Sequence, residues 1–227
     1  MVVGQLDRCD GVTVTAPDIA PLPVELHGLI NVIDNFLPDF EAVRAAAYGA
    51  AFKVLNGRAG DTGMYSDFAA RSEDMERISK HAGLPLGPLE GAGTGRFALR
   101  TSTMTGGTDI HADANLLGGI LYVGPVPGPV AGGGTSIFRH RATGLDRFPS
   151  KEEQRELGLA DDERGYQRYF SSSEGLDRSN WDEVYRVDFV PNRLLLIAGG
   201  LFHSYTSAFG SSLADGRLVQ LYFLNPR

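Results

Sequence analysis

From residue 96 onward the sequence breaks into short apolar runs of β-forming residues, separated by turns rich in Gly, Pro, Asn and Asp. The runs cover residues 96–104, 109–124, 132–140, 184–190, 192–200 and 216–225. Several short strands with such turns between them are typical of a jelly roll or a related antiparallel β fold. We therefore expect a mainly β protein, folded as a double-stranded β-helix.

Two helices are expected before the β-rich region. Pro38 suits the first turn of one helix, which carries the sequence EAVRAAAYGAAF with its good helix formers. Ser72 is the expected N-cap of the second helix, which Gly83 and Pro85 end. The first thirty or so residues suggest a short strand and a proline-punctuated lead-in. Helices in this position are expected to pack on one side of the jelly roll.

One segment departs from the strand pattern. Residues 140–183 are polar and charged, with a helical stretch in the first half, and they are far longer than a hairpin needs. We expect this insertion to cover a functional pocket, or to be a surface excursion. In the second case its anchors would be the aromatic residues Tyr166, Tyr169, Phe170 and Trp181.

The length of 227 residues predicts a single domain over 1–227, with 1–95 as the lead-in and 96–225 as the jelly-roll core. A net charge of −7 without a basic run argues against a nucleic-acid partner. The sequence shows no secretory signal and no apolar run near the roughly 20 residues that span a bilayer. The one cysteine, Cys9, excludes an internal disulfide. We expect a cytoplasmic protein that acts on a small molecule, and its oligomeric state stays open.

A His-x-Asp pair is the strongest chemical signal. On the expected strand, alternation places His111 and Asp113 on one face, with Asn115 next to them. A third ligand must come from another strand, and His203 follows the apolar run 192–200. Two imidazoles and one carboxylate leave positions open that suit iron(II), a bidentate co-substrate and O₂. The alternative is a His–Asp hydrogen bond inside an ordinary β-sandwich.

A basic residue is expected to complete this site. Arg217 opens the last strand, where its guanidinium can hold a carboxylate through two hydrogen bonds. The alternative for Arg217 is a surface salt bridge at a strand end. Arg100, Tyr122 and Asn115 are further candidates for contacts with a co-substrate or substrate, and each also suits a structural role.

Two other patterns receive less specific interpretations. Arg139, His140 and Arg141 form a basic cluster that suits either a solvated loop or the recognition of an anionic substrate. The run GPVPGPVAGGGTS lacks a following helix and a lysine, so it predicts a wide hairpin turn and not a phosphate-binding loop.

The order His111-x-Asp113, His203, Arg217 resembles that of the functional residues in the 2-oxoglutarate/Fe(II)-dependent oxygenase superfamily. The segments RFALRTSTMTGGTDIHAD, GGGTSIF and PNRLLLIAGGLFHSY are similar to the strands around those residues. The segment VIDNFLPDFEAVRAAA resembles the helical lead-in of the prolyl-hydroxylase-like branch, which points to a bacterial family within the superfamily. The resemblance covers roughly residues 30–225.

The resemblance implies a non-haem iron dioxygenase that hydroxylates a small-molecule or amino-acid-like substrate. It implies that His111, Asp113 and His203 bind Fe(II), and that 2-oxoglutarate chelates the metal while Arg217 grips its distal carboxylate. One departure is Val219, which stands where the family often has a serine. Two alternatives remain: a cupin-like metalloprotein of another reaction class, and a non-catalytic jelly roll that binds a ligand.

Overall fold

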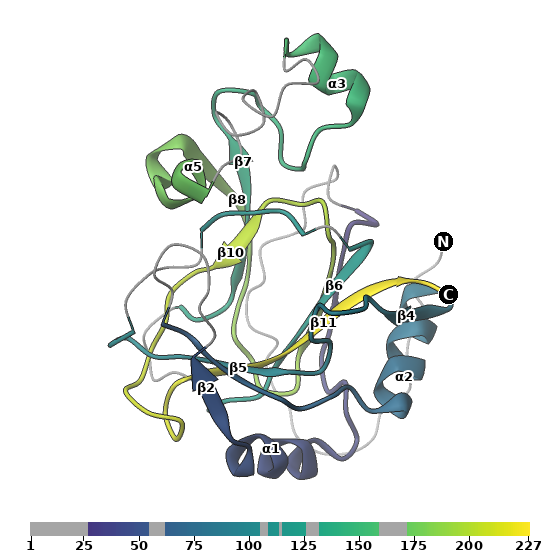
Figure 1. Cartoon of the computed structure of the whole chain (residues 1–227), viewed down its shortest axis with the longest axis vertical. Coiled ribbons are helices and arrows are strands. Elements are labelled where there is room, and N and C mark those ends of the chain that lie inside the picture. The colour runs from purple at the N-terminus through teal and green to yellow at the C-terminus, as the bar shows by residue number, and fades with distance from the viewer. Residues whose placement is uncertain (1–26, 55–61, 105–108, 114, 126–131, 159–171) are drawn as a thin grey trace, which may run out of the picture.

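Two antiparallel sheets face each other in the computed structural model (Figure 1). The model describes residues 27–54, 62–104, 109–113, 115–125, 132–158 and 172–227. The main sheet runs in the order β1 (Ile30–Ile33), β9 (Leu194–Ala198), β6 (Leu117–Tyr122), β11 (Arg217–Pro226), β5 (Phe97–Arg100), β3 (Met64–Ser66), β2 (Phe52–Val54), and β4 (Leu86–Pro88) also pairs with β11. The smaller sheet runs in the order β10 (His203–Tyr205), β7 (Thr135–His140), β8 (Trp181–Val187). The mainly β architecture predicted from the sequence is confirmed.

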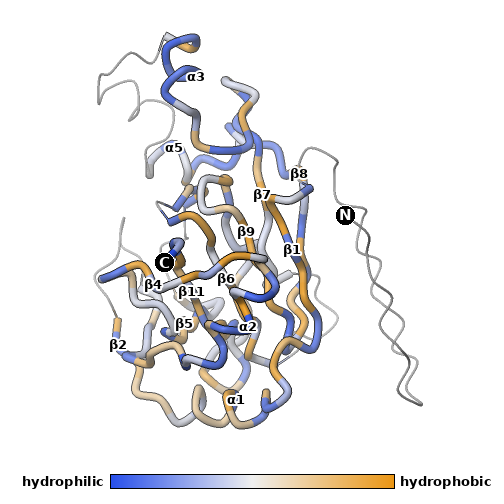
Figure 2. Tube along the Cα trace, turned by 90° about the vertical axis from the view of Figure 1, so that its right-hand side faces the viewer, coloured by the Kyte–Doolittle hydropathy of each residue, from blue (hydrophilic) through white to orange (hydrophobic). Residues whose placement is uncertain are grey.

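The strands of the main sheet alternate between two environments. On β11, Leu218 and Tyr222 belong to the apolar core under the helices, whereas Val219 and Leu221 face the smaller sheet. Apolar residues therefore line both faces of the central strands, which appear largely orange in Figure 2. The layer between the two sheets is the one that holds the candidate site.

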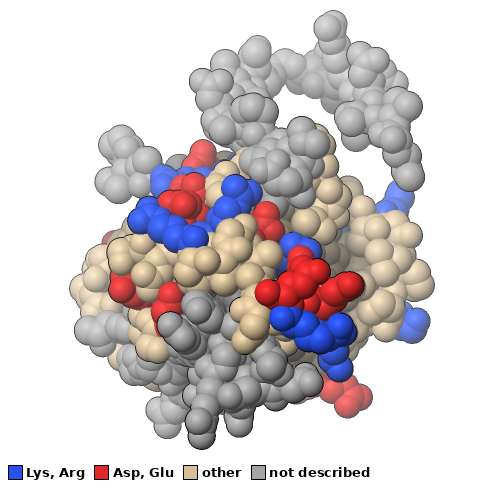
Figure 3. Space-filling model, turned by 90° about the horizontal axis from the view of Figure 1, so that it is seen from above, with Lys and Arg blue, Asp and Glu red and all other residues tan. Residues whose placement is uncertain are grey.

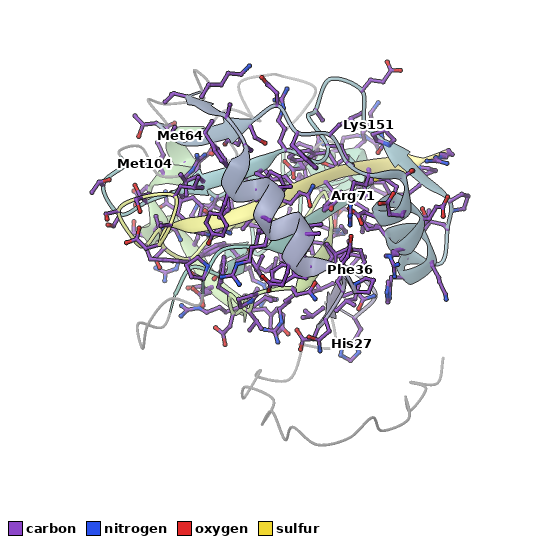
Figure 4. All side chains as sticks on the ribbon, turned by 90° about the horizontal axis from the view of Figure 1, so that it is seen from below. His27, Phe36, Met64, Arg71, Met104 and Lys151 are labelled. Atoms are coloured by element: carbon purple, nitrogen blue, oxygen red, sulfur yellow. The ribbon has the colours of Figure 1, made fainter. Side chains whose placement is uncertain are left out.

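Two helices, α1 (Phe40–Gly49) and α2 (Ser72–Ala82), cover the outer face of the main sheet, as predicted. Figure 4 shows α1 lying across β11, with Phe36 and Arg71 labelled. The helix starts differ slightly from the prediction. Pro38 precedes the N-cap Asp39, and the N-cap of α2 is Arg71 because Ser72 is already helical. Gly83 ends α2 with φ of 72°, as expected for a glycine C-cap.

The insertion is shorter than predicted at both ends, because β7 continues to His140 and β8 begins at Trp181. Between them lie α3 (Lys151–Glu156), α5 (Ser172–Leu176) and a 3₁₀ turn over Arg178–Asn180. Figure 1 shows α3 and α5 at the end of the molecule opposite α1.

Of the four aromatic anchors predicted in the insertion, Tyr166, Tyr169 and Phe170 lie outside the described residues. Trp181 is buried, and its ring centroid lies 4.9 Å from that of Phe202. It therefore packs as predicted. No helix among the described residues has the length and apolar character that a membrane span requires.

Arg71 connects the two helices. Its guanidinium donates hydrogen bonds to Asp74 at 2.7 and 2.9 Å and to Asp39, the N-cap of α1. The side chain of Asp74 is fully buried, whereas that of Arg71 is 23% exposed. A buried carboxylate without a cation is strongly unfavourable, so this pair fixes α2 against α1 and the main sheet.

We expect Arg71→Met to lower the free energy of unfolding by about 2–4 kcal/mol, because it leaves Asp74 buried without a partner. Urea unfolding followed by circular dichroism measures the loss. Arg186→Ala is the control, because Arg186 pairs with Glu183 at the surface and such pairs contribute at most about 1 kcal/mol. Equal losses in the two variants would contradict this role of Arg71.

Candidate metal centre

His111 and His203 come together through their backbones. The amide of His111 donates to the carbonyl of His203 at 3.1 Å, and the amide of His203 donates to that of His111 at 2.9 Å. His203 begins β10 of the smaller sheet, whereas His111 precedes β6 of the main sheet. This isolated antiparallel bridge places the two imidazole centroids 4.6 Å apart.

Asp113 completes a three-residue cluster. Its carboxylate oxygens lie 3.7 Å from Nε2 of His111 and 3.6 Å from Nε2 of His203. One ligand atom from each residue lies within 4.8 Å of the others, close enough to share one metal ion. The predicted strand over 109–124 is wrong in its first half, because β6 starts only at Leu117. The backbone of Asp113 is held instead by a 2.7 Å hydrogen bond from its amide to the carbonyl of Gly199.

The hydrogen bonds of the two histidines fix their tautomers. Nδ1 of His111 lies 2.8 Å from the carbonyl of Asp109, and Nδ1 of His203 lies 2.8 Å from that of Leu201. A carbonyl can only accept, so both Nδ1 atoms carry the proton and both Nε2 atoms present a lone pair. Burial lowers the pKa of His203 to about 4, so its ring is neutral near pH 7 and suited to bind a metal.

The insertion contacts the segment that carries His111. The amide of Ile110, next to His111, donates to the carbonyl of Gly175 in α5 at 3.0 Å. A Cβ at position 175 would overlap the carbonyl oxygen of Ile110. The Trp181 indole in turn donates to the carbonyl of Glu174 at 3.1 Å, which anchors α5. The segment that carries His111 is therefore positioned by the insertion.

A cavity of about 230 Å³ lies between the sheets and includes the His–Asp–His cluster in its wall. Arg217, Arg100 and Val219 line one end, and all three are buried. Arg96 and Phe223 line the other end and are partly exposed. The cavity therefore has a deep end beside the two buried arginines and an outer end beside Arg96.

Arg217 has no carboxylate partner among the described residues. Its Nε donates to the carbonyl of Gly133 at 2.6 Å, and the guanidinium lies 5.1 Å from the ring centre of Tyr205. Burial lowers the pKa of Arg217 to about 10, so the group still carries its charge at neutral pH. A buried cation held by a carbonyl and an aromatic face can accept an anion from the cavity.

Arg100 is the register partner of Arg217 across β5 and β11. Its Nη2 donates to the hydroxyl of Tyr65 at 2.6 Å. A Cβ on Gly63 would overlap the guanidinium of Arg100, so only glycine leaves room for the arginine in this position. Arg100 and Arg217 thus place two positive charges at the deep end.

Two predicted contacts lie outside the cavity wall. Tyr122 faces the layer between the sheets but is completely buried, and its hydroxyl donates to Thr135 at 3.1 Å. Burial raises the pKa of Tyr122. Asn115 is buried behind Gly118 and Gly199, and its side-chain amide nitrogen has no hydrogen-bond partner in the part of the chain that the structure describes.

The predicted basic cluster of Arg139, His140 and Arg141 does not line the cavity. His140 is fully buried and binds Glu174, with 3.1 Å between Nε2 and the carboxylate. Arg141 donates to Asp182 at 2.8 Å, and Arg139 lies 3.8 Å from Asp146. Figure 3 shows basic and acidic side chains side by side on this end of the molecule. The acids neutralise the cluster, so its interpretation as an anion site is wrong.

Five hydroxyl-bearing residues in the cavity wall were not predicted from the sequence: Tyr65, Thr135, Ser204, Tyr205 and Tyr222. Tyr65 accepts from Arg100 and Thr135 accepts from Tyr122, so each hydroxyl proton stays available to a bound molecule. For two of them, strand alternation and pairing relative to His203 could have predicted a place in the cavity wall. Tyr205 lies two residues after His203 on β10, and Thr135 pairs with it across β7.

A model of a family of unknown function (DUF6445) matches residues 112–224. No curated protein sequence matches the chain. Among solved structures, the non-heme alpha-ketoglutarate-dependent epimerase SnoN from nogalamycin biosynthesis is 14% identical, with a TM-score of 0.50 over 86% of this chain and 78% of that chain.

Two further solved structures resemble the chain less closely by TM-score. HygX from Streptomyces hygroscopicus, with nickel, 2-oxoglutarate and hygromycin B bound, is 14% identical, with a TM-score of 0.46 over 87% of this chain and 83% of that chain. A prolyl-4-hydroxylase from Pseudomonas putida is 15% identical, with a TM-score of 0.43 over 88% and 93%. The likeness to SnoN shows a shared fold and confirms the predicted double-stranded β-helix.

We expect His111→Ala, Asp113→Ala and His203→Ala each to weaken Mn(II) binding at least about 100-fold, because loss of an outer partner alone costs 10- to 100-fold. Calorimetric titration under anaerobic conditions measures the affinity, and circular dichroism checks the fold. His81→Ala, on α2, is the control and should bind as the parent does. Parent-like binding by all three variants would exclude this metal site.

We expect Gly175→Ala to weaken Mn(II) binding about tenfold or more, because a Cβ there pushes the carbonyl of Ile110 and with it His111. Gly200→Ala is a matched control, since Gly200 also lies near the site but has nothing within 4 Å of an added Cβ. The same titration measures both variants. If they do not differ, the insertion does not position His111.

Proposed function

We propose that this protein is a non-haem Fe(II)- and 2-oxoglutarate-dependent oxygenase that acts on a small molecule. One observation carries the proposal. A single cavity holds a His–Asp–His cluster, with both Nε2 atoms free to coordinate, and also a buried arginine without a carboxylate partner among the described residues. A metal-binding keto acid with a distal carboxylate requires these two features in the same cavity.

The residues fit an iron ion. His111, Asp113 and His203 provide two imidazoles and one carboxylate, the ligand set that leaves half of an octahedron open for a co-substrate and O₂. A second observation concerns Asn115, whose buried side-chain amide nitrogen has no hydrogen-bond partner among the residues described. Gly118, in the cavity wall, has no side chain to separate that amide from the cavity. Asn115 is therefore a candidate donor to a bound co-substrate.

The deep end fits the distal carboxylate of 2-oxoglutarate. Arg217 offers its guanidinium, and its position over Tyr205 places it two residues along β10 from the metal ligand His203. Two residues of a strand span roughly 7 Å, which suits a five-carbon dicarboxylate. Tyr65 and Thr135 can donate the hydrogen bonds that a serine at position 219 would otherwise provide. Arg100 adds a second positive charge.

Iron(II), 2-oxoglutarate and O₂ together supply an oxidant that can attack an unactivated C–H bond. The chain's own residues orient the reactants and exclude water. His111, Asp113 and His203 would hold the metal and Arg217 would orient the co-substrate, while Val219 and Ile120 make the wall apolar. Hydroxylation of a small molecule is the reaction we propose. SnoN, which shares the fold, is described as alpha-ketoglutarate-dependent and acts as an epimerase.

Anaerobic addition of Fe(II) and 2-oxoglutarate tests this function. We expect a weak visible charge-transfer band that needs both additions and disappears when O₂ enters, with succinate formed. A cupin-like metalloprotein of another reaction class would bind a metal but show no dependence on 2-oxoglutarate. A non-catalytic jelly roll would show neither effect. Either result would contradict the proposal.

We expect Arg217→Ala to raise the 2-oxoglutarate concentration needed for half-saturation by about 10- to 100-fold, because a charge-assisted contact contributes about 1.5–3 kcal/mol. The charge-transfer band provides the titration, and Mn(II) affinity should stay unchanged. Arg186→Ala, at the surface of β8, serves as the matched arginine control. An unchanged co-substrate titration in Arg217→Ala would assign the clamp to Arg100 instead.

A further inference from the structure

A third arginine lines the cavity, at the end opposite Arg217. Arg96, Ala98 and Arg100 alternate onto the same face of the main sheet, and all three line the cavity wall. Four residues of a strand separate Arg96 from Arg100, a distance of roughly 13 Å. Arg100 donates to Tyr65 at the deep end, whereas Arg96 lines the outer end of the cavity. Arg96 is therefore available to a second anion.

The side chain of Arg96 has no hydrogen bond or ion pair with any described residue. The acid that it influences is Asp67, whose pKa is lowered mainly by a hydrogen bond from Lys53 and only weakly by the charge of Arg96. Asp67 is bound to Lys53 at 2.7 Å. Arg96 is thus a cation in the cavity wall that no described carboxylate neutralises.

The backbone around Arg96 is fixed by β11. Gly95 donates to the carbonyl of Leu221 at 2.6 Å, and Leu221 donates to the carbonyl of Arg96 at 2.9 Å. The hydroxyl of Thr94 donates to the carbonyl of Phe223 at 2.8 Å and accepts from its amide at 3.1 Å. The backbone of Arg96 is therefore held in place before any ligand arrives, which fixes where its side chain enters the cavity.

The glycine at position 93 leaves space for the side chain of Arg96. Gly93 has φ of 77°, and a Cβ there would lie 2.5 Å from Nε of Arg96. The side chain of Arg96 thus packs over the backbone of Gly93. A bulkier residue at position 93 would displace it.

We propose that the substrate carries an oxyanion, a carboxylate or a phosphate, which Arg96 binds at the outer end of the cavity. The body of the substrate then lies against Leu221, Phe223 and Ile120, apolar residues that line the same cavity as Arg96 and the metal ligands. A planar guanidinium suits such a group because it forms two parallel hydrogen bonds to it. This assignment of the substrate class rests on the proposed function, because it takes the cavity to be the active site.

Arginine side-chain NMR tests the proposal on the full chain, loaded with Zn(II) and saturated with 2-oxoglutarate. Three probes share a branched alkyl tail: 4-methylvalerate, its primary amide, and 3-methylbutyl phosphate. We expect 4-methylvalerate or the phosphate, but not the amide, to shift one arginine Nε–Hε signal that is missing in Arg96→Gln. The affinity for that probe should fall about tenfold or more in Arg96→Gln and stay unchanged in Arg186→Gln.

The two anionic probes distinguish the sources of the oxyanion, and a response to either supports the site. A response of equal size to the amide, or a response that persists in Arg96→Gln, overturns it, as does the absence of any response. The proposed function is tested separately in the same samples, by the shift that 2-oxoglutarate causes in the Arg217 signal. Absence of a 2-oxoglutarate shift in both the Arg217 and the Arg100 signals contradicts the oxygenase proposal, whereas failure of the probe shift contradicts only the role of Arg96.

Discussion

The two backbone hydrogen bonds between His111 and His203 join the two sheets at the point where a metal ion can be shared. Each histidine uses Nδ1 to bond the carbonyl two residues earlier, and Asp113 is fixed by its own amide on Gly199. The positions of the ligands therefore depend on main-chain geometry more than on side-chain rotamers. A site built in this way is ordered before the metal binds, which is the condition for a defined coordination geometry.

The sequence predicted much of this arrangement because its strongest signals are local. The short β runs and the glycine C-cap at Gly83 follow from residue preferences over a few positions. The His-x-Asp spacing also identified His111 and Asp113 as candidate ligands. The predicted alternation along one strand, however, does not explain why their side chains lie close together. Backbone hydrogen bonds to residues 199 and 203 orient the two side chains toward each other. The spacing of two residues in the sequence does not predict such long-range pairing. The residues could be predicted, but the backbone that positions them could not.

The charged residues show more clearly that the sequence does not predict long-range contacts. Arg139 and Arg141 stand out as a basic cluster, but Asp146 and Asp182 neutralise them once the insertion folds back. Arg96 attracts no attention in the sequence because it stands alone among neutral residues. Its position in the cavity depends on the register of β5 against β11 and on the course of the glycine-rich loop before it. Whether an arginine is neutralised or available is thus a property of the tertiary structure.

The close contact between Gly63 and Arg100 has a consequence for how such chains diverge. Since the guanidinium occupies the space that a Cβ at position 63 would fill, a side chain there is tolerated only after the arginine has been replaced. The two positions are therefore expected to covary among homologues, with glycine at the first wherever the second is arginine. An ordered evolutionary path follows: the arginine can be lost first and the glycine afterwards, whereas the reverse order passes through an intermediate in which the deep end of the cavity is distorted.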